Sequence, residues 1–344
     1  MAEKKLLVLG ASGYVGSRLV TRLVHKGYKV RAASRSVKTL RKRHWAENEQ
    51  VELFAVDVGD KEALLKACEG CWGVYYLVHS MNQQHKDFAQ ADRQAARLTV
   101  EAADEKGLKR IVYLGGLGNE KGHLSEHLCS RIEVGKILAS GKVPATIFRA
   151  AMIIGSGSAS FEILRYLVRR LPIMVTPRWV TTESQPIAIS NVLHYLTECV
   201  NEPQTENGFF DIGGQDILSY QRLMEIFAQE ARLMKRVILP TPFLTPKLSS
   251  YWIHIVTPVS SYLARPLVEG LATRVVCQEQ KIRSILPQRM LTCREAIRKA
   301  IYVEPLSDAE KRDLDEGLPP AEWKYPGDPA WVKENDVIKQ GTID

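Results

Sequence analysis

A glycine-rich run at residues 10–16, GASGYVG, limits what this chain can fold into more than any other feature of its sequence. It directly follows Leu6 to Leu9, an apolar run that predicts a buried strand, and it opens Tyr14 to His25, which has the pattern of a helix. In this setting the first glycine permits a tight turn, the second leaves room for a pyrophosphate, and the third lets the helix approach the sheet. Free N–H groups at the start of the helix then hold the anion. The residues expected to line this phosphate site are Gly10, Ser12, Gly13, Tyr14, Val15 and Gly16.

The rest of the first 150 residues alternates short β-rich runs with amphipathic stretches. Further strands are expected at 29–33, 51–56, 74–78, 111–114 and 145–148, and further helices at 61–68, 87–106 and 130–140. This alternation predicts an α/β fold with a doubly wound parallel sheet over 1–150. A smaller, mostly helical substrate lobe is expected over 151–302, with a short strand at Phe209 to Ile212. Residues 303–344 are expected to form an extended acidic tail that Trp323 and Trp331 anchor to the body.

The formal net charge of +8 belongs to the body, because the tail has five Lys or Arg against eleven Asp or Glu. A basic body suits nucleic acid, an anionic membrane surface or an anionic cofactor. The sequence has no basic stripe with interleaved aromatic residues and no recognition-helix motif, so nucleic-acid binding is not expected. Six cysteines in 344 residues are too few for a disulfide framework and indicate a reducing compartment. The apolar run at the N-terminus is too short for a secretion signal, so a cytoplasmic protein is expected.

A long stretch without formal charge, 248–264, stands out in the second half of the chain, and 237–246 before it is also uncharged. Pro258 and several serines argue against a membrane-spanning helix, which needs about 20 apolar residues. A packed pair of helices over the substrate cleft is the favoured interpretation. The alternative is peripheral contact with a membrane through 237–264.

The end of the second predicted strand indicates which nicotinamide cofactor is bound. An NAD site usually has Asp or Glu about 20 residues after the glycines, where the carboxylate holds the ribose 2′-hydroxyl. This chain has Ala-Ser-Arg-Ser there instead. Arg35 can pair with a 2′-phosphate and Ser34 can donate a hydrogen bond to it, so NADP(H) is favoured over NAD(H). Asp57 and Val58 are expected beside the adenine, and Arg41 to Arg43 on a solvated helix face.

These residues make the chain similar to an atypical short-chain dehydrogenase/reductase of the NmrA-like type, from Lys5 to about Ile301. The resemblance rests on the GxxGxxG turn, on Asp57, and on the segments YYLVHSM at 75–81 and IVYLGGLG at 111–118. It implies a Rossmann fold with the nicotinamide over the ends of the fourth and fifth strands. The residues that it implies near the ribose and the nicotinamide are Leu77, Val78, His79, Leu114, Gly115 and Gly116.

The catalytic signature of that family is only partly present. Active members carry a tyrosine four residues before a lysine, and the lysine binds the nicotinamide ribose and lowers the tyrosine pKa. Lys136 matches that lysine as a catalytic and cofactor-binding residue, but Ile132 stands where the tyrosine would be. The usual serine or threonine falls among Gly115 and Gly116.

Three mechanisms therefore stay open. Hydride could pass to a hydrophobic carbonyl, enone or quinone-like acceptor that needs no strong general acid. A histidine could supply the proton, and the candidates are His79, His123 and His127. The third alternative is a catalytically inactive protein that senses NADP(H) as a regulator or serves as an assembly protein. The uncharged stretch argues for a hydrophobic small-molecule substrate and so favours the reductase.

No metal site is predicted from the sequence. The CxxC pair Cys68 and Cys71 lacks a second pair of ligands and is read as coincidental. His123 and His127 are four residues apart, but neither an HExxH motif nor a nearby carboxylate accompanies them. The sequence also lacks a GxSxG motif and a P-loop lysine, which disfavours hydrolases and kinases. Nothing in it indicates the oligomeric state.

Overall fold

The computed structural model describes residues 4–78, 88–118, 125–241, 258, 273–303, 306 and 308–337. The chain forms two compact units: unit 1 is Met1–Ala151, Val192–Gly213 and Val275–Arg289, and unit 2 is Met152–Asn191, Gly214–Arg274 and Met290–Asp344. The first change of unit falls beside the boundary expected at residue 150. Residues 192–213 and 275–289, expected in the substrate lobe, group with unit 1, and the acidic tail groups with unit 2.

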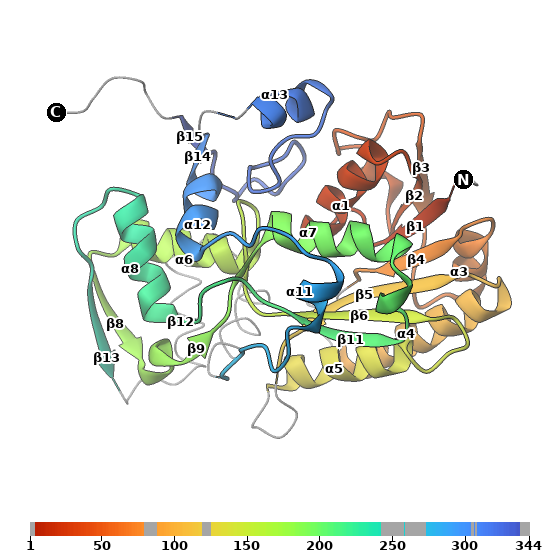
Figure 1. Cartoon of the computed structure of the whole chain (residues 1–344), viewed down its shortest axis with the longest axis horizontal. Helices are drawn as coiled ribbons and strands as arrows, with labels where there is room; N and C mark the ends of the chain where they lie inside the picture. Colours follow the sequence, from red (N-terminus) through yellow and green to blue (C-terminus); the bar gives the residue numbers. More distant parts are fainter. Residues whose placement is uncertain are drawn as a thin grey trace. The chain divides into compact units, whose positions relative to one another are not determined.

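Unit 1 is built on a seven-stranded parallel sheet with the strand order β11-β6-β5-β4-β1-β2-β3 (Figure 1). The strands are β1 (Lys5–Leu9), β2 (Lys29–Ser34), β3 (Val51–Ala55), β4 (Gly73–Tyr76), β5 (Arg110–Gly116), β6 (Ala145–Ala150) and β11 (Gly208–Ile212). The helices are α1 (Tyr14–His25), α2 (Val37–Leu40), α3 (Lys61–Cys68), α4 (Phe88–Glu105), α5 (Glu126–Leu138) and α11 (Lys281–Ile285), with most of α7 (Ile189–Glu198). The predicted doubly wound α/β fold is confirmed.

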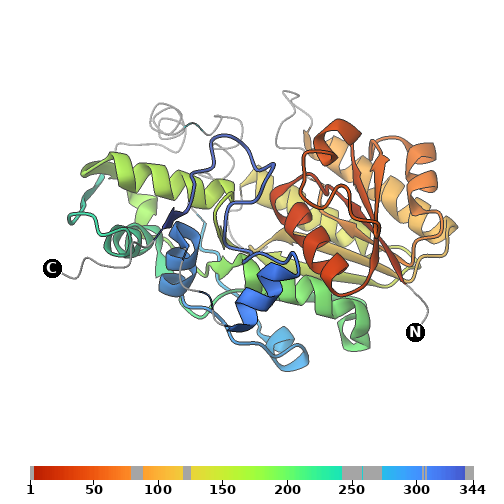
Figure 2. The ribbon, with the colours of Figure 1, turned by 90° about the horizontal axis from the view of Figure 1, so that it is seen from above.

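Helices cover both faces of this sheet because its strands are apolar on both sides. Leu7, Val74 and Ile111 share one buried core with residues of α3, α4 and α5. On the other face the Tyr75 hydroxyl donates to the Leu196 carbonyl of α7, at 2.7 Å. Figure 2 shows α1 on a different side of the sheet from α3 and α4. This layering leaves the carboxyl ends of the parallel strands as the edge where a ligand can approach.

The strand predicted at Phe209 to Ile212 was expected in the substrate lobe, and this expectation is wrong. β11 pairs in parallel with β6, and Phe210 lies opposite Phe148. Both rings are buried, and their centroids are 6.1 Å apart. Burial of these aromatic rings stabilises β11 as the edge strand of the main sheet.

Unit 2 consists of helices packed around short two-stranded sheets. The helices are α6 (Ala159–Arg170), the start of α7, α8 (Tyr220–Glu230), α12 (Cys293–Ile301) and α13 (Asp308–Asp315). The strand pairs are β7 (Ile153–Ile154) with β10 (Ile187–Ala188), β9 (Glu183–Ser184) with β12 (Leu218–Ser219), β8 (Ile173–Pro177) with β13 (Val237–Thr241), and β14 (Tyr302–Val303) with β15 (Asp336–Val337). Phe161, Phe227 and Ile297 are fully buried in the core that α6, α8 and α12 share.

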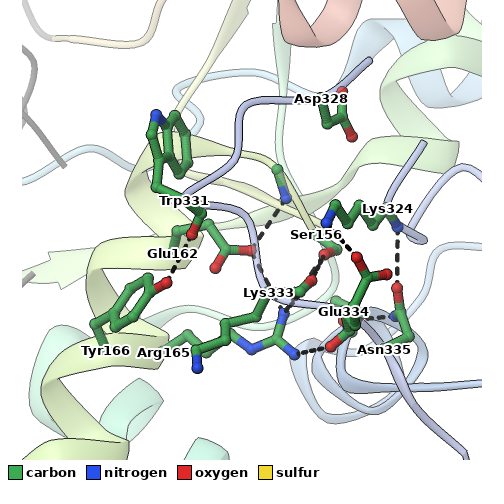
Figure 3. Close-up of polar contacts among 12 residues, drawn as sticks. Ser156, Glu162, Arg165, Tyr166, Lys324, Asp328, Trp331, Lys333, Glu334 and Asn335 are labelled. Carbon is green, nitrogen blue, oxygen red and sulfur yellow. Dashed lines mark hydrogen bonds and ion pairs between the residues drawn. The ribbon is translucent and has the colours of Figure 1, made fainter. Parts of the chain in front are cut away.

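The acidic tail is folded into unit 2 by backbone contacts (Figure 3). The fully buried Arg165 of α6 donates from Nη2 to the Glu334 carbonyl, at 2.7 Å, and the Tyr166 hydroxyl donates to the Trp331 carbonyl, at 2.7 Å. The two tryptophan side chains expected to anchor the tail are only partly buried. The residues that bury their side chains are Leu318, Pro320, Ala321, Glu322, Tyr325 and Val332.

Within the described ranges, no helix is both long and apolar enough to cross a bilayer. Of the uncharged stretch 248–264, only Pro258 is described, so the helix pair expected there lies outside the described residues.

Candidate functional site

The glycine turn joins β1 to α1 at the carboxyl end of a central strand. Gly10 has a φ of +85°, in the left-handed region that favours glycine. A Cβ on Gly10 would lie 2.6 Å from the Leu77 carbonyl oxygen, so the turn passes directly beside the residue that follows β4. The Gly10 and Ala11 N–H groups both donate to the Ala33 carbonyl, at 3.0 and 3.1 Å. These contacts fix the turn between β2 and β4.

The other two glycines of the turn have different surroundings. A Cβ on Gly16 would lie 2.3 Å from the Gly10 carbonyl oxygen and 2.9 Å from its carbon, so α1 packs against the turn at this point. A Cβ on Gly13 would meet one atom within 4 Å, the same carbonyl oxygen, at 3.2 Å. Gly13 is exposed, and the missing side chain therefore leaves open space on the outer side of the turn.

The start of α1 is suited to an anion. Gly13 is the N-cap, so no capping side chain competes for the first N–H groups, and the first turn contains no acidic residue. Ser12, Tyr14 and Val15 are partly exposed around it. Because the helix dipole places partial positive charge at this end, the residues present fit the pyrophosphate of a dinucleotide.

Arg43 supports the turn, and the expectation that Arg41 to Arg43 lie on a solvated helix face is wrong for this residue. Its side chain is 8% exposed, and its Nη2 donates to the Ser12 carbonyl. The helix α2 ends before Arg43, and the chain folds back so that the Trp45 indole N–H donates to the Ser17 carbonyl of α1, at 3.0 Å. The helical face assumed from the sequence does not exist there.

The loop after β2 carries Arg35. This side chain is exposed, and its guanidinium forms no hydrogen bond or ion pair with another described residue. Ser34 is buried; its hydroxyl donates to the Ser36 carbonyl, at 2.9 Å, and shapes the loop on which Arg35 stands. No Asp or Glu occurs from Ala33 to Ala46. The loop therefore presents an available cation and no carboxylate.

Asp57 and Val58 follow β3, the strand beside β2. The Asp57 carboxylate is exposed, and its Oδ1 accepts the Gly59 N–H at 2.9 Å, which fixes the carboxylate in the turn. Val58 is partly buried and packs against the core of unit 1. The Val56 N–H donates to the Ser34 carbonyl, at 2.9 Å, so this turn is tied to the base of the Arg35 loop.

The ends of β4 and β5 continue the same edge of the sheet. The Leu77 N–H donates to the Leu9 carbonyl at 3.0 Å, and Leu77 and Val78 are partly buried. A Cβ on Gly115 would lie 2.8 Å from a ring carbon of Tyr113, so the backbone here is close-packed. His79 and His123, two of the candidate proton donors, lie outside the described residues.

The structure does not bring Lys136 to this edge. Lys136 is exposed in the last turn of α5, beside Gly135, which packs over Ile147 and Tyr113 in the middle of the sheet. Since α5 runs back antiparallel to β5 in the βαβ crossover, its first turns lie nearer the carboxyl end of the strands. Arg131 lies there: its Nη2 donates to the Leu114 carbonyl at 2.5 Å.

His127 precedes Arg131 by four residues and so lies on the same face of α5. Burial, and next the charge of Arg131, lowers the pKa of His127 from 6.5 to about 4. The imidazole is therefore neutral near pH 7 and keeps one N–H that can donate a hydrogen bond. His127 and Arg131 are four residues apart, which is the spacing of the tyrosine and the lysine in the short-chain reductases that the sequence resembles.

An ion pair links β6 and β11 at the same edge, and sequence reasoning missed it. Arg149 lies opposite Asp211, and their Nη2 and Oδ1 atoms are 2.7 Å apart. Burial raises the pKa of the fully buried Asp211 carboxyl, while the Gln278 N–H and Arg149 oppose that rise. The sequence alone does not predict the ion pair between Arg149 and Asp211, because it depends on β11 lying beside β6 in the sheet.

The described residues contain no group of three or more His, Cys, Asp or Glu that could hold a metal ion. Burial raises the pKa of the Cys68 thiol to about 12 and also raises that of Cys71. Both thiols of the CxxC pair are therefore protonated near pH 7, which makes them poor ligands and nucleophiles.

Residues 10–140 match a protein family described as NAD(P)H-binding. Cinnamoyl-CoA reductase 2 of Arabidopsis thaliana is 29% identical over 119 residues, which is 33% of this chain and 36% of that protein. The chain thus spans about a third of the length of the curated relatives that head this comparison.

Two solved structures share the fold over most of the chain. Triphenylmethane reductase of a Citrobacter species, complexed with NADP(H), has a TM-score of 0.69 at 16% identity and covers 86% of this chain and 100% of its own. An NADPH-dependent quinone oxidoreductase of Escherichia coli, complexed with NADPH, has a TM-score of 0.67 at 15% identity and covers 85% of this chain and 98% of its own. The comparisons confirm the expected NAD(P)H-binding domain and agree with the resemblance to atypical short-chain reductases.

Proposed function

We propose that this chain, whose residues 10–140 match the NAD(P)H-binding family, is an NADP(H)-dependent oxidoreductase acting on a hydrophobic carbonyl, enone or quinone-like acceptor. The observation that carries the proposal is a glycine turn that leaves the first N–H groups of α1 without a side-chain cap, with an available cation, Arg35, on the neighbouring loop. The quinone and dye reductases that share the fold support the acceptor class.

Arg35 is the residue that selects the phosphorylated cofactor. Its guanidinium can form a forked pair with a 2′-phosphate, which no carboxylate nearby in the sequence opposes. Asp57 then accepts a hydrogen bond from the adenine amino group through Oδ2, because its Oδ1 already accepts the Gly59 N–H. Ser34 contributes by holding the loop, since its own hydroxyl proton goes to the Ser36 carbonyl.

NADPH, when bound, supplies the hydride. The chain's own residues orient the nicotinamide at the ends of β4 and β5, where Leu77, Val78, Leu114 and Gly115 exclude water. We assign to His127 and Arg131 the task that tyrosine and lysine have in the resembling family. The neutral imidazole donates a hydrogen bond from its N–H to the acceptor oxygen, and Arg131 provides positive charge beside this oxygen as it becomes anionic. Water then supplies the proton that completes the reduction.

Cofactor selection is tested with Arg35→Ala. We expect this variant to lose about 1.5–3 kcal/mol of NADPH binding, a factor of roughly 10 to 100, while NADH binding changes little. Fluorescence titration of the purified protein with each cofactor measures this. Arg41→Ala, at an exposed arginine of the next turn, is the matched control. Equal losses for NADPH and NADH in Arg35→Ala would remove the 2′-phosphate assignment.

Turnover is tested by NADPH oxidation with a panel of quinones and enones. We expect the parent protein to oxidise NADPH only when an acceptor is present. Arg131→Met and His127→Phe should each lower this rate and leave the affinity for NADPH unchanged. Activity lost in Lys136→Ala but kept in Arg131→Met would return the catalytic role to the lysine. Tight NADPH binding with no oxidation by any acceptor would favour the alternative, a regulator or assembly protein that senses NADP(H).

A further inference from the structure

The two-stranded sheet of β8 and β13, the β8–β13 ribbon, is apolar on both faces. The strands lie side by side in unit 2 (Figure 1). Met174 is buried and Ile238 packs against the same core, so alternate residues of both strands face inward. A sheet with one face on a core and the other in water normally alternates apolar with polar residues. The ribbon has apolar residues at the outward positions as well, which indicates that its outer face has a partner.

The outward residues form one patch. Val237 lies opposite Ile173 and Leu239 opposite Val175, so their side chains are neighbours on one face. Their exposed fractions are 47%, 61%, 52% and 55%, and Met234, just before β13, is 80% exposed. Among the described residues these five are the majority of the eight large apolar side chains that are strongly exposed. A concentration of this kind marks an interaction surface.

The ends of the ribbon carry cations. Arg232 and Lys235 are exposed in the turn before β13, and Arg178 is exposed just after β8. None of these three side chains forms a hydrogen bond or ion pair with another described residue. The sequence contains no Asp or Glu from 163 to 182 or from 231 to 268. The patch is therefore flanked by available positive charge that no nearby acid in the sequence neutralises.

We propose that the outer face of the β8–β13 ribbon, with Met234 and these three basic residues, docks on the surface of an anionic lipid bilayer. Apolar side chains enter the boundary between headgroups and acyl chains, and the cations meet lipid phosphates. Contact of this kind is peripheral, and it goes beyond the proposed reductase activity, on which it does not depend.

A second copy of the chain fits the surface less well. A symmetric dimer through the ribbon would place the same patch on both partners, so the basic ends of one copy would face those of the other. Like charges brought together in this way repel, and no acidic group in these segments compensates. An anionic bilayer provides the missing charge and has no fixed shape to match.

The test is sedimentation of the purified full chain with vesicles. We expect at least tenfold stronger binding to phosphatidylcholine mixed with phosphatidylglycerol than to phosphatidylcholine alone. The difference should shrink in high salt, because screening weakens attraction to a charged surface. Equal binding to both vesicles, or binding to neither, would overturn the proposal.

Two double variants separate the contributions of the patch and the cations. Val175→Ser with Leu239→Ser, and Arg232→Glu with Lys235→Glu, should each weaken binding to the anionic vesicles tenfold or more. Leu314→Ser with Lys109→Glu, at exposed positions outside the ribbon, should bind as the parent does. Thermal unfolding that stays unchanged establishes that each variant folds. Unweakened vesicle binding in both ribbon variants contradicts the assignment, as does a dimer in solution that the serine variant dissociates.

Discussion

At the scale of single residues, Gly13 and Gly16 provide a matched pair for the glycine turn. Gly16→Ala would put a methyl group against the Gly10 backbone, so we expect a loss of about 1–3 kcal/mol of unfolding free energy. Gly13→Ala meets a single atom at 3.2 Å and should cost less than about 1 kcal/mol, but its methyl group enters the pyrophosphate space. Urea unfolding and NADPH titration of both variants measure the contrast. A Gly13→Ala protein that binds NADPH normally would exclude the turn as the phosphate site.

His127 predicts a pH dependence of stability. Its pKa in the folded chain is lowered to about 4, whereas the unfolded histidine titrates near 6.5, so the unfolded state binds more protons between these values. The free energy of unfolding is therefore highest above pH 6.5, where the imidazole is neutral in both states. It falls as the pH drops towards about 4, by roughly 3 kcal/mol in total. Urea unfolding across this range should show a slope that His127→Gln lacks. His25→Gln, at an exposed histidine, should keep the slope.

Residue types and their spacing were enough to locate the glycine turn and Arg35. Each lies on its own loop, between one strand and the helix that follows it. They were not enough for Lys136 or Arg43. Which of two cations on a helix reaches the sheet depends on where that helix begins. The Ser125 side chain accepts the Leu128 N–H and starts α5 at Glu126, four residues before the start expected at Ser130. That early start brings His127 into the helix, one turn before Arg131.

At the scale of elements, the contact between α6 and the tail predicts how unit 2 is stabilised. Arg165→Met would leave the fully buried Glu162 without its cation and the Glu334 carbonyl without the guanidinium that donates to it, at a cost of about 3–5 kcal/mol. Arg169→Met is the control, because its ion pair with Asp336 is partly exposed and should contribute about 1 kcal/mol or less. Urea unfolding of both variants measures the difference, and equal losses would contradict a buried role for Arg165.

The same variant has a defined dependence on pH. Burial already raises the pKa of Glu162, and Arg165 opposes that rise, so the pKa should rise further in Arg165→Met. A carboxyl whose pKa is raised in the folded state is protonated in both states at low pH and then costs no stability. The cost appears as the pH rises above its pKa in the unfolded chain, because the folded state resists losing the proton. The loss in Arg165→Met should therefore be smaller near pH 4 than near pH 7.

Helices and strands with strong periodicity were predictable as elements, since each buries an apolar face that its own sequence displays. The neighbours of an element were less predictable. β11 has the same apolar pattern whether it joins a small lobe or the main sheet, and only its pairing with β6 decides between them. The tail presented few apolar residues, and its attachment depends on backbone carbonyls that accept from Arg165 and Tyr166, which no side-chain pattern reveals.

At the scale of the whole molecule, the chain passes from unit to unit several times, and each unit is assembled from separated segments. Residues 1–150 expressed alone should therefore be poorly stable, because they lack β11 and the α7 residues that cover one face of the sheet. Circular dichroism and urea unfolding of this fragment beside the full chain check the expectation. Cooperative unfolding of the fragment at the denaturant concentration of the full chain would show that these later segments are dispensable.

The place of β11 in the sheet also bears on how the protein is made. β6 is complete at residue 150, but its edge partner begins at residue 208, so nearly sixty residues must be translated before that edge is paired. During this interval a nascent chain on the ribosome exposes a strand edge that can pair with other chains. We therefore expect chaperone demand and losses to aggregation to peak between these two points of synthesis, and slow codons placed there to lower the yield of folded protein.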